Sequence, residues 1–213
     1  MSARVRQAPP RERRSQTERT AETRERVMAA VVESIAEVGY PKTTANEIAR
    51  RAGVTWGAVQ HHFGDKDGIL VAVLEESFDR FAELLADHPD DLPKEALSLE
   101  ERVSLFIDRS WLHFGSAHYR STFEILQNLP PELELSWRSE VTATWNRIWV
   151  HFFPESLAAT DKSIDLMRYT VSVMSGIAVM SLLEGAPDRS RSAELRFLKQ
   201  TLIRELGGDD ASH

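Results

Sequence analysis

Apolar residues recur every three or four positions along most of the chain, which is the spacing of an α-helix that buries one face. No segment shows the sustained alternation of a half-buried strand, so the pattern predicts an all-α fold. Outside residues 43–70, the predicted helices cover residues 17–39, 98–115, 116–128, 132–153, 161–184 and 189–206. Glycine and proline mark most of the boundaries between them, as expected where a helix must end.

Residues 43–70 predict three helices with little chain between them. Thr44 suits the N-cap of the first helix and begins an S/T-x-x-E capping box, while Gly53 suits the left-handed turn that ends it. Thr55 suits the cap of a second short helix, and Asp65 the cap of a third that runs to about residue 87. Two short helices joined by a turn that contains glycine form a helix-turn-helix, whose second helix enters the DNA major groove.

The second of these helices has two different sides at roughly 100° per residue. The side expected to pack on the preceding helix holds Ala58, Val59, His62 and Phe63. The side expected to face the groove holds Trp56, Gly57, Gln60 and His61. Gln60 carries both a donor and an acceptor, which suits a bidentate contact with adenine.

This stretch resembles the DNA-binding domain of TetR-family transcriptional regulators, whose pattern is roughly T-x-x-x-I-A-x-x-A-G-V-[ST]-x-G-x-x-Y-x-[YH]-F-x-x-K-x-x-L. The chain departs from the pattern at Gln60, where the family has tyrosine, and Trp56 is bulky for its position. The matching residues are Thr44, Ile48, Ala49, Ala52, Gly53, Val54, Thr55, Gly57, His62, Phe63, Lys66, Ile69 and Leu70. Both departures lie on the predicted groove face, so they bear on the operator sequence rather than on the fold.

Lys66 lies in the first turn of the helix over residues 65–87, where free backbone amides favour anions, so we expect it to contact a DNA phosphate. The resemblance implies that this helix joins the DNA-binding domain to the rest of the chain. The predicted DNA-binding residues are Thr44, Thr55, Trp56, Gly57, Gln60, His61 and Lys66.

Charge is unevenly distributed along the 213 residues, although the net charge is −7. Residues 1–68 hold 12 Lys and Arg against 9 Asp and Glu, whereas residues 69–213 hold 14 against 24. A basic N-terminal third on an acidic body is expected where one end of a molecule meets phosphate. Residues 1–16 are basic and rich in proline, and we expect a disordered arm that follows the DNA backbone or, alternatively, a solvated tail.

The absence of cysteine fits a reducing compartment, and the N-terminus has no apolar signal segment. The longest apolar run, Val171 to Leu183, is 13 residues and too short to span a bilayer. We therefore expect a cytoplasmic protein with no membrane segment. The predicted division is an arm over 1–16, a DNA-binding domain over 17–64, a connecting helix over 65–87 and a ligand-binding and dimerisation domain over 88–213, which begins with a linker at 88–97.

The helix over residues 161–184 is apolar nearly all round, so it must bury two sides, one of them against a partner. The resemblance implies that it pairs with the last helix to form a four-helix bundle in a homodimer. The predicted interface residues are Val173, Gly176, Ile177, Met180, Leu195, Leu198 and Leu202. A two-fold dimer presents two recognition helices to the half-sites of a near-palindromic operator.

Large rings gather in residues 98–153, which suggests an aromatic-lined pocket, with ordinary core packing as the alternative for each ring. The resemblance implies a small-molecule effector here and leaves its identity open. The predicted pocket residues are Trp111, Phe114, His118, Phe123, Trp137, Trp145 and Trp149.

No catalytic, cofactor or metal motif stands out, and the adjacent His61 and His62 diverge too far to chelate one ion from one helix face. We therefore predict a transcriptional regulator rather than an enzyme, namely a repressor that a ligand releases from its operator. One alternative is a DNA-binding regulator controlled by its abundance or by a protein partner. A second, from another class, is a helical enzyme or lipid carrier.

Overall fold

The computed structural model describes residues 16–87, 96–129, 137–155, 160–184 and 191–207. Within these ranges the chain forms nine α-helices with short 3₁₀ segments between some of them and contains no strand, so the all-α prediction is confirmed. The predicted arm apart from Gln16, most of the predicted linker and the start of the helix predicted at residue 132 lie outside the described residues.

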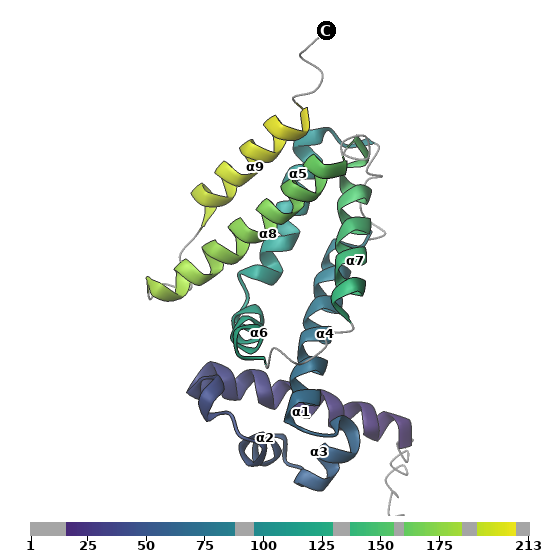
Figure 1. Ribbon diagram of the computed structural model, residues 1–213, viewed down its shortest axis with the longest axis vertical. Coiled ribbons are helices and arrows are strands. Elements are labelled where there is room, and N and C mark those ends of the chain that lie inside the picture. Colours follow the sequence, from purple (N-terminus) through teal and green to yellow (C-terminus); the bar gives the residue numbers. More distant parts are fainter. Residues whose placement is uncertain (1–15, 88–95, 130–136, 156–159, 185–190, 208–213) are drawn as a thin grey trace, which may run out of the picture.

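The N-terminal helices lie together at one end of the molecule, and we refer to them as the head (Figure 1). The head consists of α1 (Gln16–Val38), the 3₁₀ helix η1 (Tyr40–Lys42), α2 (Ala45–Ala52) and α3 (Trp56–Phe63). The long helix α4 (Lys66–Leu85) rises from the head into the remaining helices, which we refer to as the body. The body consists of α5 (Leu99–Phe114), α6 (Ala117–Asn128), α7 (Trp137–Phe152), α8 (Thr160–Leu183) and α9 (Ser192–Gly207).

All three predicted caps in the head are formed. The Thr44 hydroxyl accepts from the Glu47 amide at 3.3 Å, the Thr55 hydroxyl from the Ala58 amide at 3.2 Å, and the Asp65 carboxylate from the Gly68 amide at 2.9 Å. The predicted capping box is only half present, because the Glu47 carboxylate accepts from Arg50 and Arg51. A complete capping box begins α5, between Ser98 and Glu101.

Two hydrophobic clusters hold the described helices together, one in the head and one in the body. The head cluster consists of Val27, Ala30, Val31, Ile35, Ile48, Ala49, Ala52, Val59, Ile69, Leu70, Val73, Leu74 and Ile125. The N-terminal half of α4 belongs to this cluster, whereas Phe81 and Leu85, farther along α4, belong to the body cluster. The predicted domain division stays a prediction, and α4 is shared between the two cores.

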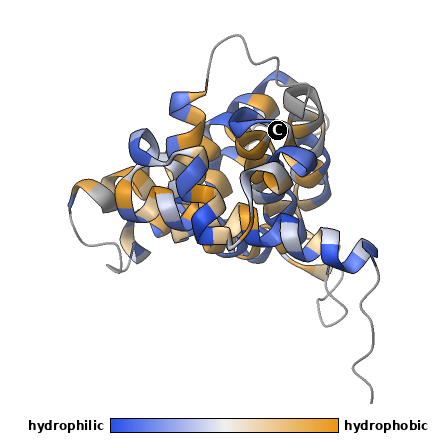
Figure 2. Cartoon of the chain, turned by 90° about the horizontal axis from the view of Figure 1, so that it is seen from below, coloured by the Kyte–Doolittle hydropathy of each residue, from blue (hydrophilic) through white to orange (hydrophobic). Residues whose placement is uncertain are grey.

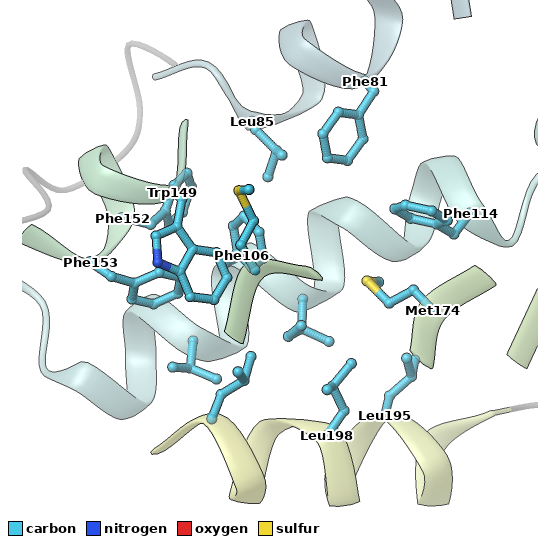
Figure 3. Packing of buried hydrophobic residues seen from close by; sticks show 14 of the residues in the cluster. Phe81, Leu85, Phe106, Phe114, Trp149, Phe152, Phe153, Met174, Leu195 and Leu198 are labelled. Atoms are coloured by element: carbon cyan, nitrogen blue, oxygen red, sulfur yellow. The ribbon is translucent and has the colours of Figure 1, made fainter. Parts of the chain in front are cut away.

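The body cluster is built largely from rings and leucines of five helices (Figure 3). Trp149, Phe152 and Phe153 are fully buried beside Phe106 of α5. Leucines of α9 close the opposite side of the cluster. Figure 2 shows the corresponding pattern on the helices, which carry hydrophobic and hydrophilic stripes along their length. Each helix therefore buries one stripe, as expected for amphipathic helices around a common core.

Candidate nucleic-acid interface

The turn between α2 and α3 fixes the angle at which α3 leaves the head core. Gly53 adopts φ 66°, in the left-handed region, and its amide donates back to the end of α2. The next amide, that of Val54, donates to the Ala49 carbonyl at 3.1 Å. Val59 then anchors α3, because its side chain is fully buried against the apolar face of α2. These contacts make a helix-turn-helix whose second helix has one buried face and one free face.

The free face of α3 holds three of the four residues predicted to face the groove. Gly57, Gln60 and His61 are exposed, and so are the capping threonines Thr44 and Thr55. Each threonine hydroxyl accepts an amide of its own helix and keeps its hydrogen to donate elsewhere. The five residues together form a polar surface with donors and acceptors suited to base edges and phosphates.

Trp56 differs from the prediction, because its ring is partly buried and packs against the head cluster. Trp56 is the first residue of α3 and follows the turn directly, so its ring can pack on the apolar residues of the head cluster. Trp56 therefore contributes to the head core, and only its outer edge remains available to DNA.

Lys66 is partly buried, and its ammonium group lies 4.6 Å from the centre of the Tyr40 ring. This is the geometry of a cation–π interaction, which is weak at a solvated site. Lys66 also begins α4, where backbone amides favour an anion. Its predicted phosphate contact stays a prediction, and the Tyr40 ring is its partner in this structure.

Two structural residues of the head have roles that the sequence did not indicate. Arg24 donates to the His62 carbonyl at 3.1 Å and lies over the Phe63 ring. It thereby holds the C-terminal end of α3 against α1. Gly68 allows the first turn of α4 to approach α3, since a Cβ there would overlap the Phe63 carbonyl oxygen.

An ion-pair network joins α2 to the end of α1. Arg51 contacts the carboxylates of Glu37 and Glu47, both at 2.6 Å, and Arg50 contacts Glu47 at 2.7 Å. Hydrogen bonds from Arg50 and Arg51 lower the pKa of Glu47 to about 2. These two arginines are therefore engaged within the head, although the sequence alone would present them as basic groups near DNA.

Helix α6 of the body is attached directly to the head, which sequence reasoning missed. Ile125 of α6 is fully buried in the head cluster. The Tyr40 amide donates to Glu124 at 3.1 Å, and the Ser121 hydroxyl donates to the Val32 carbonyl at 3.2 Å. The head therefore meets the body through α6 as well as through α4, the single connection that the sequence suggested.

The residues predicted to line a ligand pocket are distributed over two places. Phe114, Trp145 and Trp149 lie among the rings of the body cluster, where Trp145 and Phe81 have ring centres 4.4 Å apart. Trp111 and Phe123 pack partly buried against the same cluster. His118 also lines a cleft against α1 of the head, and its place in a ligand pocket stays a prediction. The Trp137 side chain lies outside the described part of the structure.

Polar atoms without partners occur inside this ring cluster. Among the described residues, Ser110 Oγ and Trp149 Nε1 are buried and have no hydrogen-bond partner. They come from α5 and α7, respectively. Burial also lowers the pKa of the neighbouring His113 to about 4, with a smaller contribution from the charge of His118. The cluster thus contains polar groups that an apolar core alone does not use.

The predicted dimer residues also divide into two groups. Leu195, Leu198 and Leu202 are buried in the body cluster of their own chain, so they have no surface left for a second subunit. This prediction is wrong because the leucine stripe of α9 faces inward. Val173 and Ile177 are partly buried, whereas Gly176 and Met180 are exposed. The large exposed apolar residues of α8 and α9 are Tyr169, Met180, Leu183 and Phe197.

Two further properties concern the described residues as a whole. None of the helices in these ranges is both long enough and apolar enough to cross a bilayer. Nor do three or more His, Asp or Glu side chains in these ranges come together in a way that would hold a metal ion.

The head sequence matches a known family. The sequence model of the bacterial regulatory proteins of the tetR family matches residues 27–73, which run from the C-terminal half of α1 through the N-terminal half of α4. The regulator BetI of one Escherichia coli strain is 30% identical over 117 residues, which cover 49% of this chain and 60% of BetI. The regulator TtgW of Pseudomonas putida is 39% identical over 90 residues, 42% of this chain and 55% of TtgW. The chain thus aligns with little more than half the length of these relatives.

Solved structures share the fold over nearly the whole chain. A TetR transcription regulator from Haloarcula marismortui ATCC 43049 superposes with a TM-score of 0.66 at 18% identity, over 88% of this chain and 98% of that one. The regulator FadR from Bacillus subtilis, in complex with stearoyl-CoA, has a TM-score of 0.63 at 20% identity, over 85% and 96%. The family match in the head and the shared fold beyond it lead to one conclusion. The head of this chain is similar in sequence to the bacterial regulatory proteins of the tetR family, and the described chain as a whole shares its fold with solved structures of such regulators.

Proposed function

We propose that this protein is a sequence-specific DNA-binding transcriptional regulator that works as a homodimer in the cytoplasm. In this proposal it is a repressor that a small-molecule effector releases from a near-palindromic operator. The observation that carries the proposal is the free face of α3, where Gly57, Gln60 and His61 are exposed on a helix anchored by the buried Val59. An exposed polar face on a firmly held recognition helix is what readout of base edges requires.

Homodimerisation is supported by the apolar residues that α8 and α9 leave exposed. Phe197 of α9 is 63% exposed and Met180 of α8 is 47% exposed. Gly176 lies on the outer side of α8, where an added Cβ would meet open space. A small residue beside large apolar ones allows two copies of α8 to approach each other in a two-fold interface.

Effector binding in the body is supported by the orphaned Ser110 Oγ and Trp149 Nε1 within the ring cluster. A few polar groups in an apolar surrounding are typical of small-molecule sites. Two solved neighbours hold small molecules, imidazole in EbrR and stearoyl-CoA in FadR. A ligand that binds one arrangement of α4 and α6 more tightly would move the head, and coupling of this kind is typically on the order of 1–3 kcal/mol.

The DNA-binding proposal is tested by selecting duplexes from a randomised pool and measuring affinity by fluorescence anisotropy at several salt concentrations. We expect tight binding to the selected duplex and a steep loss of affinity with salt. The Gln60→Ala variant should lose about 1–3 kcal/mol of discrimination at one base pair. Gln127→Ala, which changes an exposed glutamine of α6, is the matched control. Equal affinity for selected and scrambled duplexes would refute the proposal.

The dimer is tested by sedimentation with two matched substitutions. Phe197 and Leu112 are both 63% exposed, on α9 and α5 respectively. We expect Phe197→Glu to convert the dimer to a monomer and Leu112→Glu to leave it intact, because only the first would place a charge in the proposed interface. If the Phe197→Glu variant is still a dimer, the interface lies outside α9.

A second candidate is a regulator of the same kind without a small-molecule effector. It is favoured by the tight packing of Trp149, Phe152 and Phe153, which are fully buried against Phe106. Thermal melting in the presence of a broad metabolite library separates the two candidates. A ligand that binds the native state raises the melting temperature by mass action, and no shift across broad chemistry would favour the effector-free regulator.

A further inference from the structure

A cleft of about 350 Å³ lies where α1 of the head passes α4 and α6. Figure 1 shows this junction, with α1 crossing beneath both helices. The cleft is lined by Glu25, Met28, Ala29, Val32, Glu33, Glu76, Arg80 and His118. Its volume is at the lower end of the range for small-molecule sites. Because its lining residues include neither the rings of the body cluster nor the exposed residues of α3, it is separate from both regions described above.

The α1 side of the cleft is one continuous face of that helix. Met28 and Val32 are partly buried against the head cluster and form an apolar floor, and carboxylates lie at either end of it. The edge of the cleft beside Val32 is held closed by the hydrogen bond from Ser121 of α6. This hydrogen bond holds α6 beside α1 at that edge, which favours a preformed site over a transient gap.

The charges around the cleft favour a cation. Three carboxylates line it, and Arg80 neutralises one of them by pairing with Glu76. Within the described residues, neither Glu25 nor Glu33 has an ion-pair or hydrogen-bond partner. Two uncompensated negative charges facing an apolar floor attract a positively charged molecule that also has an apolar part.

His118 adds a polar group on the side opposite α1. Its Nε2 atom is buried and has no hydrogen-bond partner. Burial and, to a lesser extent, the Arg80 charge lower the pKa of His118, so its ring is neutral at pH 7. A neutral ring on this side of the cleft adds no positive charge that would repel a cation.

We propose that this cleft is a binding site for a small organic cation that has a flat apolar body. The apolar body would lie on Met28 and Val32, and the charge would lie between Glu25 and Glu33, with His118 on the opposite side. A metal ion does not suit the site, since no three His, Asp or Glu side chains in the described ranges converge closely enough to hold one. The ligand bridges head and body, so its binding is coupled to DNA affinity, a consequence that rests on the proposed function.

The site is tested on the full-length protein without DNA, by NMR titration with benzamidinium, its neutral analogue benzamide and the anion benzoate. We expect saturable binding of benzamidinium with shifts of the His118 ring, at least about fivefold weaker binding of benzamide, and none of benzoate. The double variant Glu25→Gln/Glu33→Gln should weaken benzamidinium about tenfold, since each exposed ion pair contributes roughly two- to fivefold. Glu75→Gln, an exposed neighbour on α4 that does not line the cleft, is the matched control.

Three outcomes would overturn the site. These are no saturable binding of benzamidinium, equal binding of all three probes, and an unchanged affinity in the double variant. The DNA experiment is separate. It measures the affinity of the wild type and of the double variant for the selected duplex in the presence of benzamidinium chloride. An equal concentration of sodium chloride in its place is the control for ionic strength. A protein that fails to bind DNA leaves the NMR result standing, whereas loss of the NMR result leaves the DNA-binding proposal untouched.

Discussion

The head and the body each have a hydrophobic cluster, and they differ in the further contacts that set their geometry. In the head, short-range bonds set the geometry, because Thr44, Thr55 and Asp65 each cap a helix through an amide three residues away. In the body, rings from distant parts of the chain meet, as Phe81 of α4 does with Trp145 of α7. A local bond forms whenever its segment is helical, whereas a ring contact depends on several helices arriving together. The geometry of the head is therefore specified more locally along the sequence than that of the body.

The largest expected effect tests whether the head is independent of the body. Ile125 of α6 is fully buried in the head cluster, so Ile125→Ala should destabilise the protein by about 2–5 kcal/mol. Leu126→Ala, at the exposed neighbouring position, is the control and should change stability little. Urea unfolding followed by circular dichroism gives both values. Equal stability of the two variants would mean that the head does not depend on α6.

The body should respond to pH through His113. Its folded pKa, about 4, is below the usual value of 6.5 for histidine because the ring is buried among Phe81, Phe114 and Tyr119. Below pH 6.5 the unfolded chain therefore binds more protons than the folded chain. The contribution of His113 to the free energy of unfolding is fully present above that pH and is lost as the pH falls toward 4. The loss should reach about 3 kcal/mol, at 1.36 kcal/mol for each pKa unit.

This pH effect is measured as unfolding free energy between pH 7.5 and pH 4.5. His113→Phe should flatten the profile, since it removes the titrating group and keeps a ring in the cluster. His151→Gln, at an exposed position beside Asp87, is the control for a histidine outside the core. Parallel profiles for the wild type and His113→Phe would contradict the assignment.

Gly68 and Gly57 separate residues that the fold needs from residues that DNA binding needs. Gly68→Ala should destabilise the head by about 1–3 kcal/mol, because the new methyl group would overlap the Phe63 carbonyl oxygen. Gly57→Ala should leave stability unchanged or slightly raised, since its Cβ meets only the Thr55 hydroxyl at 3.9 Å. Gly57→Ala should instead weaken DNA binding, if α3 lies in the groove. Thermal melting and anisotropy on the same two proteins measure both effects, and identical behaviour of the two variants would contradict this account.

The difference between local and long-range contacts explains how much could be predicted from the sequence. The helices and the head caps were predictable because Thr44, Thr55 and Asp65 act within a few residues of their own position. The place of His118 was not, since its position depends on how α6 docks on α1. The inward direction of Leu198 was equally hidden, because a single leucine stripe on α9 fits either a core or a partner. Contacts that join distant segments leave no local signal in one sequence.

The smallest expected effect concerns Lys66, which packs on Tyr40 and is also predicted to contact a DNA phosphate. If its ammonium group only stacks on Tyr40, Lys66→Ala costs about 0.5–1 kcal/mol of stability and leaves the salt dependence of DNA binding unchanged. If it also contacts a phosphate, affinity falls about equally for all sequences and the salt slope decreases by about 1. Anisotropy at four or more salt concentrations distinguishes the two results.

The Lys66 result also bears on how the body reaches the head. Tyr40, the ring beneath Lys66, is bound to α6 through its amide and through its hydroxyl, which donates to the Asn128 carbonyl at 3.4 Å. A phosphate that draws Lys66 away from this ring would loosen a contact shared with the body. Tyr40→Phe keeps the ring and the amide and removes only the bond to Asn128. The double variant Lys66→Ala/Tyr40→Phe tests whether the two contacts are coupled. A loss of DNA affinity equal to the sum of the two single losses would show that the contacts are independent. A smaller loss would show that DNA and α6 act on the same residue.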